Sequence, residues 1–162
     1  MAITKQKKEE ILSKVRDIVA GAKTIVFVNF HSLTVAEERT IRAALREENV
    51  GYTVAKKTLI RIALSEKGFT GECPGLDGEV ALAYAEDEIA PARAIATFVK
   101  KYPEHLSMLG GIFAGAYVDK AGITSISAIP GMETLRAQFV QLINSPLQRF
   151  AVVLNAKAEK GE

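Results

Sequence analysis

Hydrophobic residues recur along this chain with two spacings, one typical of helices and one typical of strands. Near the start, Ile11, Val15, Ile18 and Val19 fall on one side of a helical turn. This spacing predicts an amphipathic helix over residues 4–21 that ends at a glycine. Unbroken β-branched and aromatic runs predict strands at residues 23–30, 50–55 and 79–85.

Capping and breaking residues place the other elements. Thr34 stands three residues before Glu37, the pattern of a capping box, and predicts a helix from there to about Asn49. The glycines within 106–118 indicate a fourth strand that is broken by a bulge or by close packing. The remaining predictions are helices at 56–68 and 88–102, a Gly/Pro-rich loop at 69–78, and a short connector at 119–131.

The order of these elements indicates an α+β fold. Alternating strands and helices with one short extra helix suggest a ferredoxin-like, mostly antiparallel sheet with flanking helices. A doubly wound parallel sheet is the alternative. The Pro-Gly pair at Gly131 marks a break, so we expect a domain at 1–131 and a long, extended C-terminal helix within 132–162.

The C-terminal segment carries a continuous apolar stripe. At about 100° per residue the stripe is roughly 140° wide, and neutral side chains such as Gln138 and Asn144 occupy the opposite side. Pro146 also falls on this side, but our candidate partner-binding residues are the other apolar residues of the stripe. The apolar stripe consists of Leu135, Phe139, Leu142, Ile143, Leu147, Phe150, Val153 and Leu154.

Three surfaces could cover the apolar stripe: the domain's own sheet, a membrane surface, or other protein chains. A helix over 133–157 would be about 37 Å long at 1.5 Å per residue, which is longer than one face of a small domain. Helices that lie on membranes favour lysine and arginine on their polar side, whereas this side is neutral. Other chains are therefore the favoured cover, with the domain's own sheet as the alternative.

The apolar stripe repeats after 11 residues, which is three helical turns. Residues 138–146 align with 149–157 and match Phe139 to Phe150, so both copies face the same way. Pro146 lies between them and predicts a bend, because it cannot donate a hydrogen bond to the preceding turn. We interpret the copies as two docking segments in series; chance similarity within an apolar helix is the alternative.

Composition indicates the cellular compartment and shows that charge is unevenly distributed along the chain. The chain has 162 residues, 48% of them apolar, and a single cysteine, Cys73. With no signal peptide and no membrane-spanning run evident in the sequence, we expect a cytosolic protein. Up to Gly75 there are 13 Lys and Arg against 9 Asp and Glu, a net charge of +4, and the remainder has 8 against 10, a net charge of −2. The first part therefore favours a polyanionic partner.

Basic residues gather at the starts of two predicted helices. Their side chains could neutralise phosphates, and the free backbone amides of a helix start could hold another. An ordinary solvated face is the alternative. The candidate RNA-binding residues are Lys5, Lys7, Lys8, Lys56, Lys57, Thr58 and Arg61.

The chain resembles a known family in the order and spacing of several segments. "KTIVFVNFHSLTVAEERTIRAALREENVGYTVAKKTLIRIAL" and "IPGMETLRAQFVQLINSPLQRFAVVLNAKAEK" are similar to the bacterial family of large-subunit ribosomal protein ten. The resemblance implies a structural constituent of the large ribosomal subunit. In that family the first domain binds the GTPase-associated region of large-subunit ribosomal RNA, beside large-subunit ribosomal protein eleven. The C-terminal helix carries dimers of the small acidic stalk protein, which recruit translational GTPases.

Some positions depart from the family pattern. Lys57 stands where the family often has asparagine, which keeps or raises the basic character of the helix. His31 and Ser32 replace an Arg-Gly pair, so one cation is missing from that loop, and the Gly-Glu-Val at 78–80 replaces a usual Gly-Pro-Thr. The tail is one 11-residue segment shorter than in relatives with three, so we expect two stalk-protein dimers, that is, four copies.

The sequence disfavours an enzyme. Cys73 would need a histidine base, but His31 and His105 lie in unrelated segments. The glycines around Ile112 do not fit the dinucleotide-binding pattern, which requires a second glycine at that position. We expect no catalytic residue, cofactor or metal. A non-ribosomal helical adaptor without RNA binding is the remaining alternative.

Overall fold

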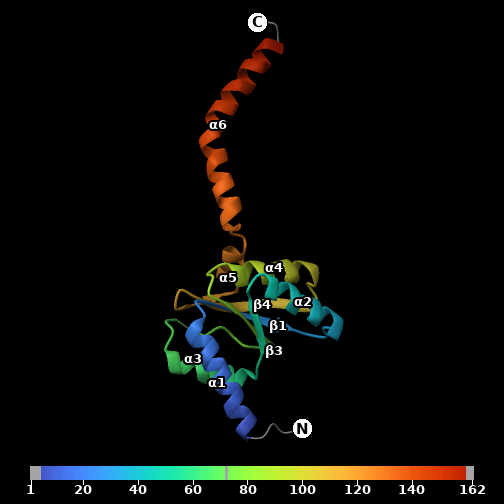
Figure 1. Cartoon of the computed structure of the whole chain (residues 1–162), viewed down its shortest axis with the longest axis vertical. Coiled ribbons are helices and arrows are strands. Elements are labelled where there is room, and N and C mark those ends of the chain that lie inside the picture. The colour runs from blue at the N-terminus through green and yellow to red at the C-terminus, as the bar shows by residue number, and fades with distance from the viewer. Residues whose placement is uncertain (1–4, 72, 160–162) are drawn as a thin grey trace. The chain divides into compact units, whose positions relative to one another are not determined.

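A computed structural model describes residues 5–71 and 73–159 of the chain, which divides into two units, Met1–Ile129 and Pro130–Glu162. The predicted helix start at residue 4 lies outside the described residues. The first unit contains α1 (Lys5–Gly21), β1 (Thr24–Phe30), α2 (Val35–Glu47), β2 (Gly51–Val54), α3 (Lys57–Lys67), β3 (Glu79–Ala85), α4 (Ala90–Lys101), β4 (Leu106–Phe113), β5 (Ala116–Asp119) and α5 (Lys120–Ser127), and the second contains α6 (Met132–Glu159) (Figure 1).

The strands of the first unit form one sheet in the order β2-β3-β1-β4-β5, and all neighbouring strands are antiparallel. Helix α2 joins β1 to β2 across β3, and α4 joins β3 to β4 across β1. Two such split connections define the ferredoxin-like arrangement. The predicted fold class is therefore confirmed, and the doubly wound parallel sheet was the wrong alternative.

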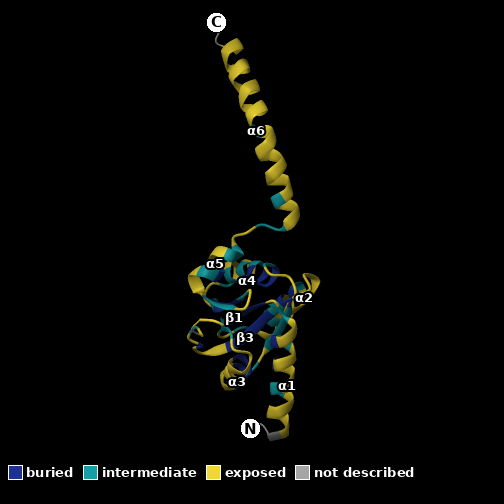
Figure 2. Cartoon of the chain, turned by 90° about the vertical axis from the view of Figure 1, so that its left-hand side faces the viewer, coloured by how far each residue is buried: buried dark blue, intermediate teal, exposed yellow. Residues whose placement is uncertain are grey.

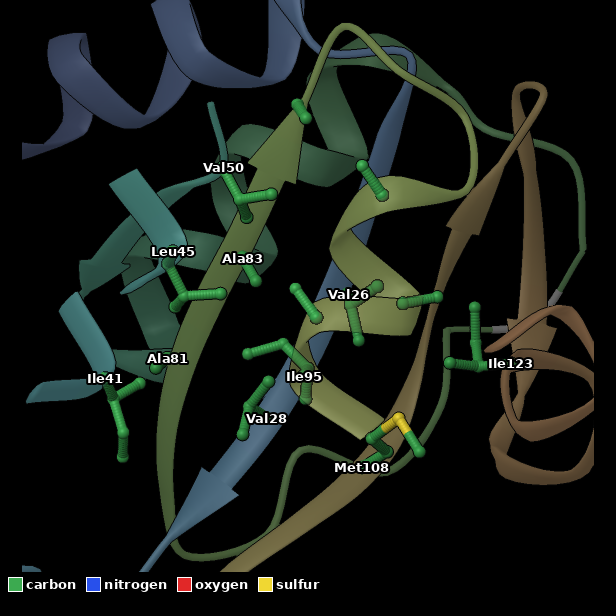
Figure 3. Close-up of a cluster of buried hydrophobic side chains, with 14 of the residues drawn as sticks. Val26, Val28, Ile41, Leu45, Val50, Ala81, Ala83, Ile95, Met108 and Ile123 are labelled. Atoms are coloured by element: carbon green, nitrogen blue, oxygen red, sulfur yellow. The ribbon is translucent and has the colours of Figure 1, made fainter. Parts of the chain in front are cut away.

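Both faces of the sheet are covered, because side chains alternate along each strand. On β1, Val26 and Val28 enter a cluster with α2, α4 and α5, which Figure 3 shows. Ile25 and Phe27 enter a second cluster with α1 and α3. Figure 1 accordingly shows α2, α4 and α5 on one side of the sheet and α1 and α3 on the other. Each fully buried large side chain contributes about 1.5–3 kcal/mol before ordering costs.

The predicted fourth strand at 106–118 is wrong in one respect, because it is a hairpin of two strands. Ala114 and Gly115 form a two-residue connection with φ values of 49° and 82°. Positive φ at both central residues is the hallmark of a type I′ turn, which matches the twist of the flanking strands. Alanine is unusual at the first of these positions, so the sequence lacks the usual Asn-Gly or Gly-Gly signal.

The glycines of β4 have the roles predicted for them. The pairing of β1 with β4 shifts register between Phe27 and Val28, which is a bulge. At Gly111 a Cβ would lie 2.4 Å from the carbonyl oxygen of Ile25 and 2.9 Å from the side chain of Ile123. Only glycine permits this approach of β1 and α5 to β4.

The predicted connector at 119–131 is also wrong, because it contains α5. Asp119 caps this helix and accepts a hydrogen bond of 2.8 Å from the amide of Gly122. Ile123 is fully buried against the sheet. Glycine, serine and threonine give the segment little intrinsic helix propensity, so it is the burial of Ile123 that favours the helix. The other predicted helices and strands are confirmed to within two residues at each end.

The predicted capping box of α2 is present. The Thr34 hydroxyl accepts from the Glu37 amide at 3.3 Å, and the Thr34 amide donates to the Glu37 carboxylate at 2.9 Å. Hydrogen bonds from Thr34 lower the pKa of Glu37. The resulting stabilisation is complete above the pKa of an unfolded glutamate and is lost as the pH falls through the lower folded value.

Replacing Thr34 with alanine should lower the free energy of unfolding by about 1 kcal/mol, because an amide of the first turn loses its acceptor. Urea unfolding of the purified protein at neutral pH measures this. Thr40→Ala is the matched control: Thr40 lies inside α2, donates only to the carbonyl of Ala36, and should change stability little. Equal losses in both variants would contradict the capping argument.

Candidate functional site

The predicted basic residues at 56–61 form the exposed start of α3. Lys56 is the N-cap residue, and its side chain makes no capping hydrogen bond. Lys57 and Thr58 lie in the first turn and Arg61 in the second, and all four side chains are exposed. The Leu59 amide donates to the Lys56 carbonyl at 2.9 Å, so the amides of Lys57 and Thr58 are the ones that the helix itself leaves without an acceptor. They lie beside three cations, an arrangement that favours phosphate groups.

The other predicted cations lie at the start of α1, the helix beside α3. Lys7 and Lys8 are exposed in its first turns, and Lys5 begins it, although the Lys5 side chain lies outside the described residues. The two helices share the core cluster on one face of the sheet. The predicted RNA-binding residues thus come from neighbouring helices of a single layer.

Polar contacts join α1 and α3 near their C-terminal ends. Arg16 donates to both carboxylate oxygens of Glu66, at 2.6 and 2.7 Å. The Lys67 ammonium donates to the carbonyl oxygen of Val19 and, at 3.2 Å, to that of Ala20, where a cation complements the end of α1. Among the described residues, the ion pairs and side-chain hydrogen bonds of this helix pair thus involve cations near the C-terminal ends and not the exposed cations at the helix starts.

Charge is distributed unevenly over the first unit. Among the described residues, the carboxylate–cation pairs within 4 Å use Arg16, Arg42 and Arg93, so the cations at the start of α3 have no such partner. Carboxylates gather elsewhere, around a groove of about 800 Å³ at the ends of α1, α2 and β3. That groove is bordered by Asp17, Glu48, Glu86 and Asp87. A polyanion is repelled there and attracted to the start of α3.

A cleft of about 310 Å³ lies beside Arg61, where α3 meets the loop before β3 and strand β5. Burial raises the pKa of the Cys73 thiol in this cleft, so the thiol is protonated at neutral pH and is a poor nucleophile. No histidine lines the described part of the cleft. The His31 backbone amide donates to the His105 carbonyl at 2.9 Å, and the Nδ1 atom of the His105 ring lies 3.1 Å from the His31 carbonyl oxygen. The cleft is lined by Arg61, Leu64, Ser65, Cys73, Pro74, Gly75 and Tyr117.

The apolar stripe lies on α6, and nothing within the second unit covers it. Leu135 is half-buried, but the other residues of the stripe are exposed, from 52% at Leu154 to 71% at Leu142 (Figure 2). Val140 and Val152, outside the stripe, are exposed as well. Among the described residues, no helix is both long enough and apolar enough to cross a bilayer.

Helix α6 continues through Pro146, and Figure 1 shows its axis changing direction near the middle. Proline has no amide hydrogen, so the carbonyl oxygen of Leu142 loses its usual partner in the helix. The Ser145 hydroxyl donates to that oxygen at 2.9 Å instead. This replacement lets a single helix contain the bend between the two 11-residue segments.

Comparison with known proteins identifies the family. Residues 3–100 match the family model described as "Ribosomal protein L10". The chain belongs to this ribosomal protein L10 family. The large ribosomal subunit protein uL10 of Paracidovorax citrulli (strain AAC00-1) is 34% identical over 163 residues, with 100% of this chain and 96% of the relative covered. That of Verminephrobacter eiseniae (strain EF01-2) is 35% identical over 163 residues, with 100% and 93% covered.

Family membership confirms several predictions. The chain is a structural protein of the large ribosomal subunit and not an enzyme, and it acts in the cytoplasm, at the ribosome. The alignments span the whole chain, so they include α6 as well as the α/β unit.

Among the described residues, no cluster of three His, Cys, Asp or Glu side chains is arranged to hold a metal ion.

The cleft beside Arg61 is the feature of this surface that sequence patterns do not reveal. Its lining comes from α3, from the loop at 73–75 and from β5, which the fold alone brings together. Only Arg61 and Cys73 stand out in the sequence, and for different reasons. The pairing of β4 with β5 places Tyr117 at the cleft, and that hairpin was predicted as one strand.

A fragment of residues 1–131 should fold by itself, because the described buried core residues all lie between Val15 and Ile123. Its thermal midpoint should stay within about 4 °C of the α/β transition in the full chain, a shift that corresponds to about 1 kcal/mol. Circular dichroism and differential scanning calorimetry measure this. A fragment ending at residue 119, which lacks α5 and Ile123, should be clearly less stable. An unfolded 1–131 fragment would instead make α6 part of the core.

Proposed function

We propose that the α/β unit binds the GTPase-associated region of large-subunit ribosomal RNA, beside large-subunit ribosomal protein eleven. We further propose that α6 carries two dimers of the small acidic stalk protein, which recruit translational GTPases. The observation behind this proposal is that, among the described residues, the ion pairs of the first unit do not include the cations at the start of α3, while the apolar stripe of the second unit is exposed. RNA and an apolar protein partner are the ligands that such surfaces attract.

RNA contact through α3 and the start of α1 follows from charge and exposure. Lysine and arginine gain affinity by releasing counterions from phosphates, and exposed cations without a carboxylate partner do so at least cost. Helical amides and a threonine hydroxyl at the start of α3 can add hydrogen bonds to phosphate oxygens. The residues assigned to RNA are Lys5, Lys7, Lys8, Lys56, Lys57, Thr58 and Arg61.

The exposed apolar stripe of α6 supports docking of the stalk protein. Both faces of the sheet in the α/β unit are occupied by that unit's own helices. Each 11-residue segment offers about 16 Å of helix with a phenylalanine and two branched apolar residues, enough for one helical contact. The partner-binding residues are Leu135, Phe139, Leu142, Ile143, Leu147, Phe150, Val153 and Leu154.

Reversing Lys56 and Lys57 to glutamate should weaken binding to the GTPase-associated RNA and reduce its salt dependence. The plot of log K against log salt concentration has a negative slope. Each lost phosphate contact makes that slope less steep by about 0.9, so losing two contacts makes it less steep by about 2. Filter binding or calorimetry over a range of salt concentrations gives the slope.

Lys100 and Lys101 supply a matched control for the charge reversal. They are also adjacent and exposed, but they end α4 on the opposite face of the sheet. Reversing them should leave the slope near that of the wild type. The same loss in both double variants would remove α3 from the interface. No binding of the RNA by the wild type would favour the helical adaptor instead.

Ending the chain after Pro146 should reduce the bound stalk protein from four copies to two. The truncated helix keeps Phe139, Leu142 and Ile143 but loses Phe150 and the residues that follow. Native mass spectrometry of the complex co-expressed with the small acidic stalk protein gives the copy number directly. Loss of all copies, or six copies on the full chain, would contradict two independent segments.

Two point variants test whether the partner docks on the apolar stripe or on any exposed apolar residue of α6. Phe150→Asp should remove one dimer, because Phe150 lies in the second segment of the stripe. Val152→Asp should keep all four copies, although Val152 and Phe150 are both 65% exposed, because Val152 faces the opposite side of the helix. Equal losses would mean that docking does not follow the stripe.

A further inference from the structure

The cations of α3 lie on the side of the helix that borders the cleft beside Arg61. Lys57, Arg61, Leu64 and Ser65 are spaced at i, i+4, i+7 and i+8, so they follow one side of the helix. Lys57 and Arg61 are exposed, Leu64 is buried, and the cleft opens where this row meets the loop before β3. A strand of RNA on the two cations would therefore pass directly over the cleft.

The loop that lines the cleft is anchored to the sheet on both sides of residues 73–75. Thr70 bonds to the β4–β5 hairpin twice, donating to Gly115 at 3.3 Å and accepting from the Tyr117 amide at 2.9 Å. Further along the loop, Leu76 is fully buried, and the side-chain amide of Asn29 donates to the backbone carbonyl of Asp77 at 2.9 Å. The loop is thus anchored both before and after the residues 73–75 that line the cleft.

The Tyr117 ring and the loop proline are fixed as well. Tyr117 packs edge to face on Phe69, with centroids 5.8 Å apart and planes at 76°. Pro74 lies against Gly110, where a Cβ would come within 3.0 Å of the proline ring. Rigid aromatic and apolar walls favour a flat, uncharged ligand, because little conformational freedom is lost when it enters.

The chemistry of the cleft selects among ligands. Its volume of about 310 Å³ is at the small end of the range for ligand pockets, roughly 300–1,000 Å³. Leu64, Pro74 and Tyr117 provide apolar and aromatic surface. The Ser65 hydroxyl donates to the carbonyl of Ile62 at 2.9 Å, so its oxygen remains as an acceptor in the cleft. One guanidinium, that of Arg61, borders it. A planar ring with hydrogen-bonding edges that is attached to a phosphate fits this combination.

We propose that the cleft receives one unpaired base of the RNA that binds along α3, while Arg61 and Lys57 contact the neighbouring phosphates. Single-stranded RNA is commonly recognised by splayed bases that stack on aromatic side chains, and cations track the backbone. The proposal rests on the proposed RNA binding and adds to it a site that reads a base and not only phosphates.

Cys73 provides a direct test, because it is the only cysteine of the chain, is exposed, and lines the cleft. Alkylation with N-phenylmaleimide, at a pH above neutral because burial raises the pKa of the thiol, adds a ring that fills the cleft. The full-length adduct should bind the GTPase-associated RNA roughly tenfold more weakly, within the range for losing one stacked base. Circular dichroism confirms that the adduct is folded.

Two controls separate the cleft from the chemistry of labelling. Unlabelled Cys73→Ser gives the reference affinity, and treating it with the same reagent should not change that affinity. In that background Thr97→Cys places the same adduct at an exposed position of α4, on the opposite face of the sheet, and should bind RNA as the unlabelled Cys73→Ser protein does. Unchanged affinity of the Cys73 adduct would overturn the cleft proposal and leave RNA binding by Lys56 and Lys57 intact.

Abasic substitutions in the RNA identify the base. At one unpaired position, removing the base should weaken binding to the wild-type protein by the same factor as the adduct, with no further loss when both changes are combined. Additive losses at all unpaired positions would overturn the proposal. So would an adduct that affects only binding of a protein partner. If the wild type binds no RNA, the cleft proposal and the proposed function both fail.

Discussion

The fold depends on the burial of β1 on both sides and along both edges. Its side chains fill two separate core clusters, Val26 and Val28 on one face and Ile25 and Phe27 on the other. Its backbone pairs with β3 and with β4 over its whole length. Every helix of the α/β unit packs into one of these two clusters, so one seven-residue strand sets the position of both helical layers.

Covering both faces of the sheet has consequences for each proposed binding surface. Helix α3 follows β2 and precedes β3 in the chain, and it packs on the cluster around Ile25 and Phe27. Its outer side is therefore available for cations. Buried residues such as Ile60 and Leu64 fix the orientation of that outer side. The apolar stripe of α6 is exposed, and we propose that other chains cover it. One unit thus offers a charged, rigid surface, and the other offers a bare helix.

The chemistry of this protein is that of contact and not of catalysis. Its only thiol has a raised pKa in a cleft without a histidine among the described residues, and the His105 ring lies against the His31 carbonyl instead. Specific binding then has to come from shape and from the placement of charges. Pro146 is an instance: the Ser145 hydroxyl satisfies the carbonyl that proline leaves vacant, which permits a bend inside a continuous helix.

The sequence by itself determined the features that depend on neighbouring residues. Periodicity located the helices, most strands and the apolar stripe, and Thr34 and Glu37 located a capping box, because each of these is a local pattern. Tertiary structure alone decided the features that depend on distant contacts. Helix α5 forms because Ile123 is buried over Gly111, the hairpin forms because β5 pairs with β4, and the cleft beside Arg61 exists because three segments meet there. Local propensity is weak in these segments, and the free energy that settles them comes from burial and pairing with residues far away in the chain.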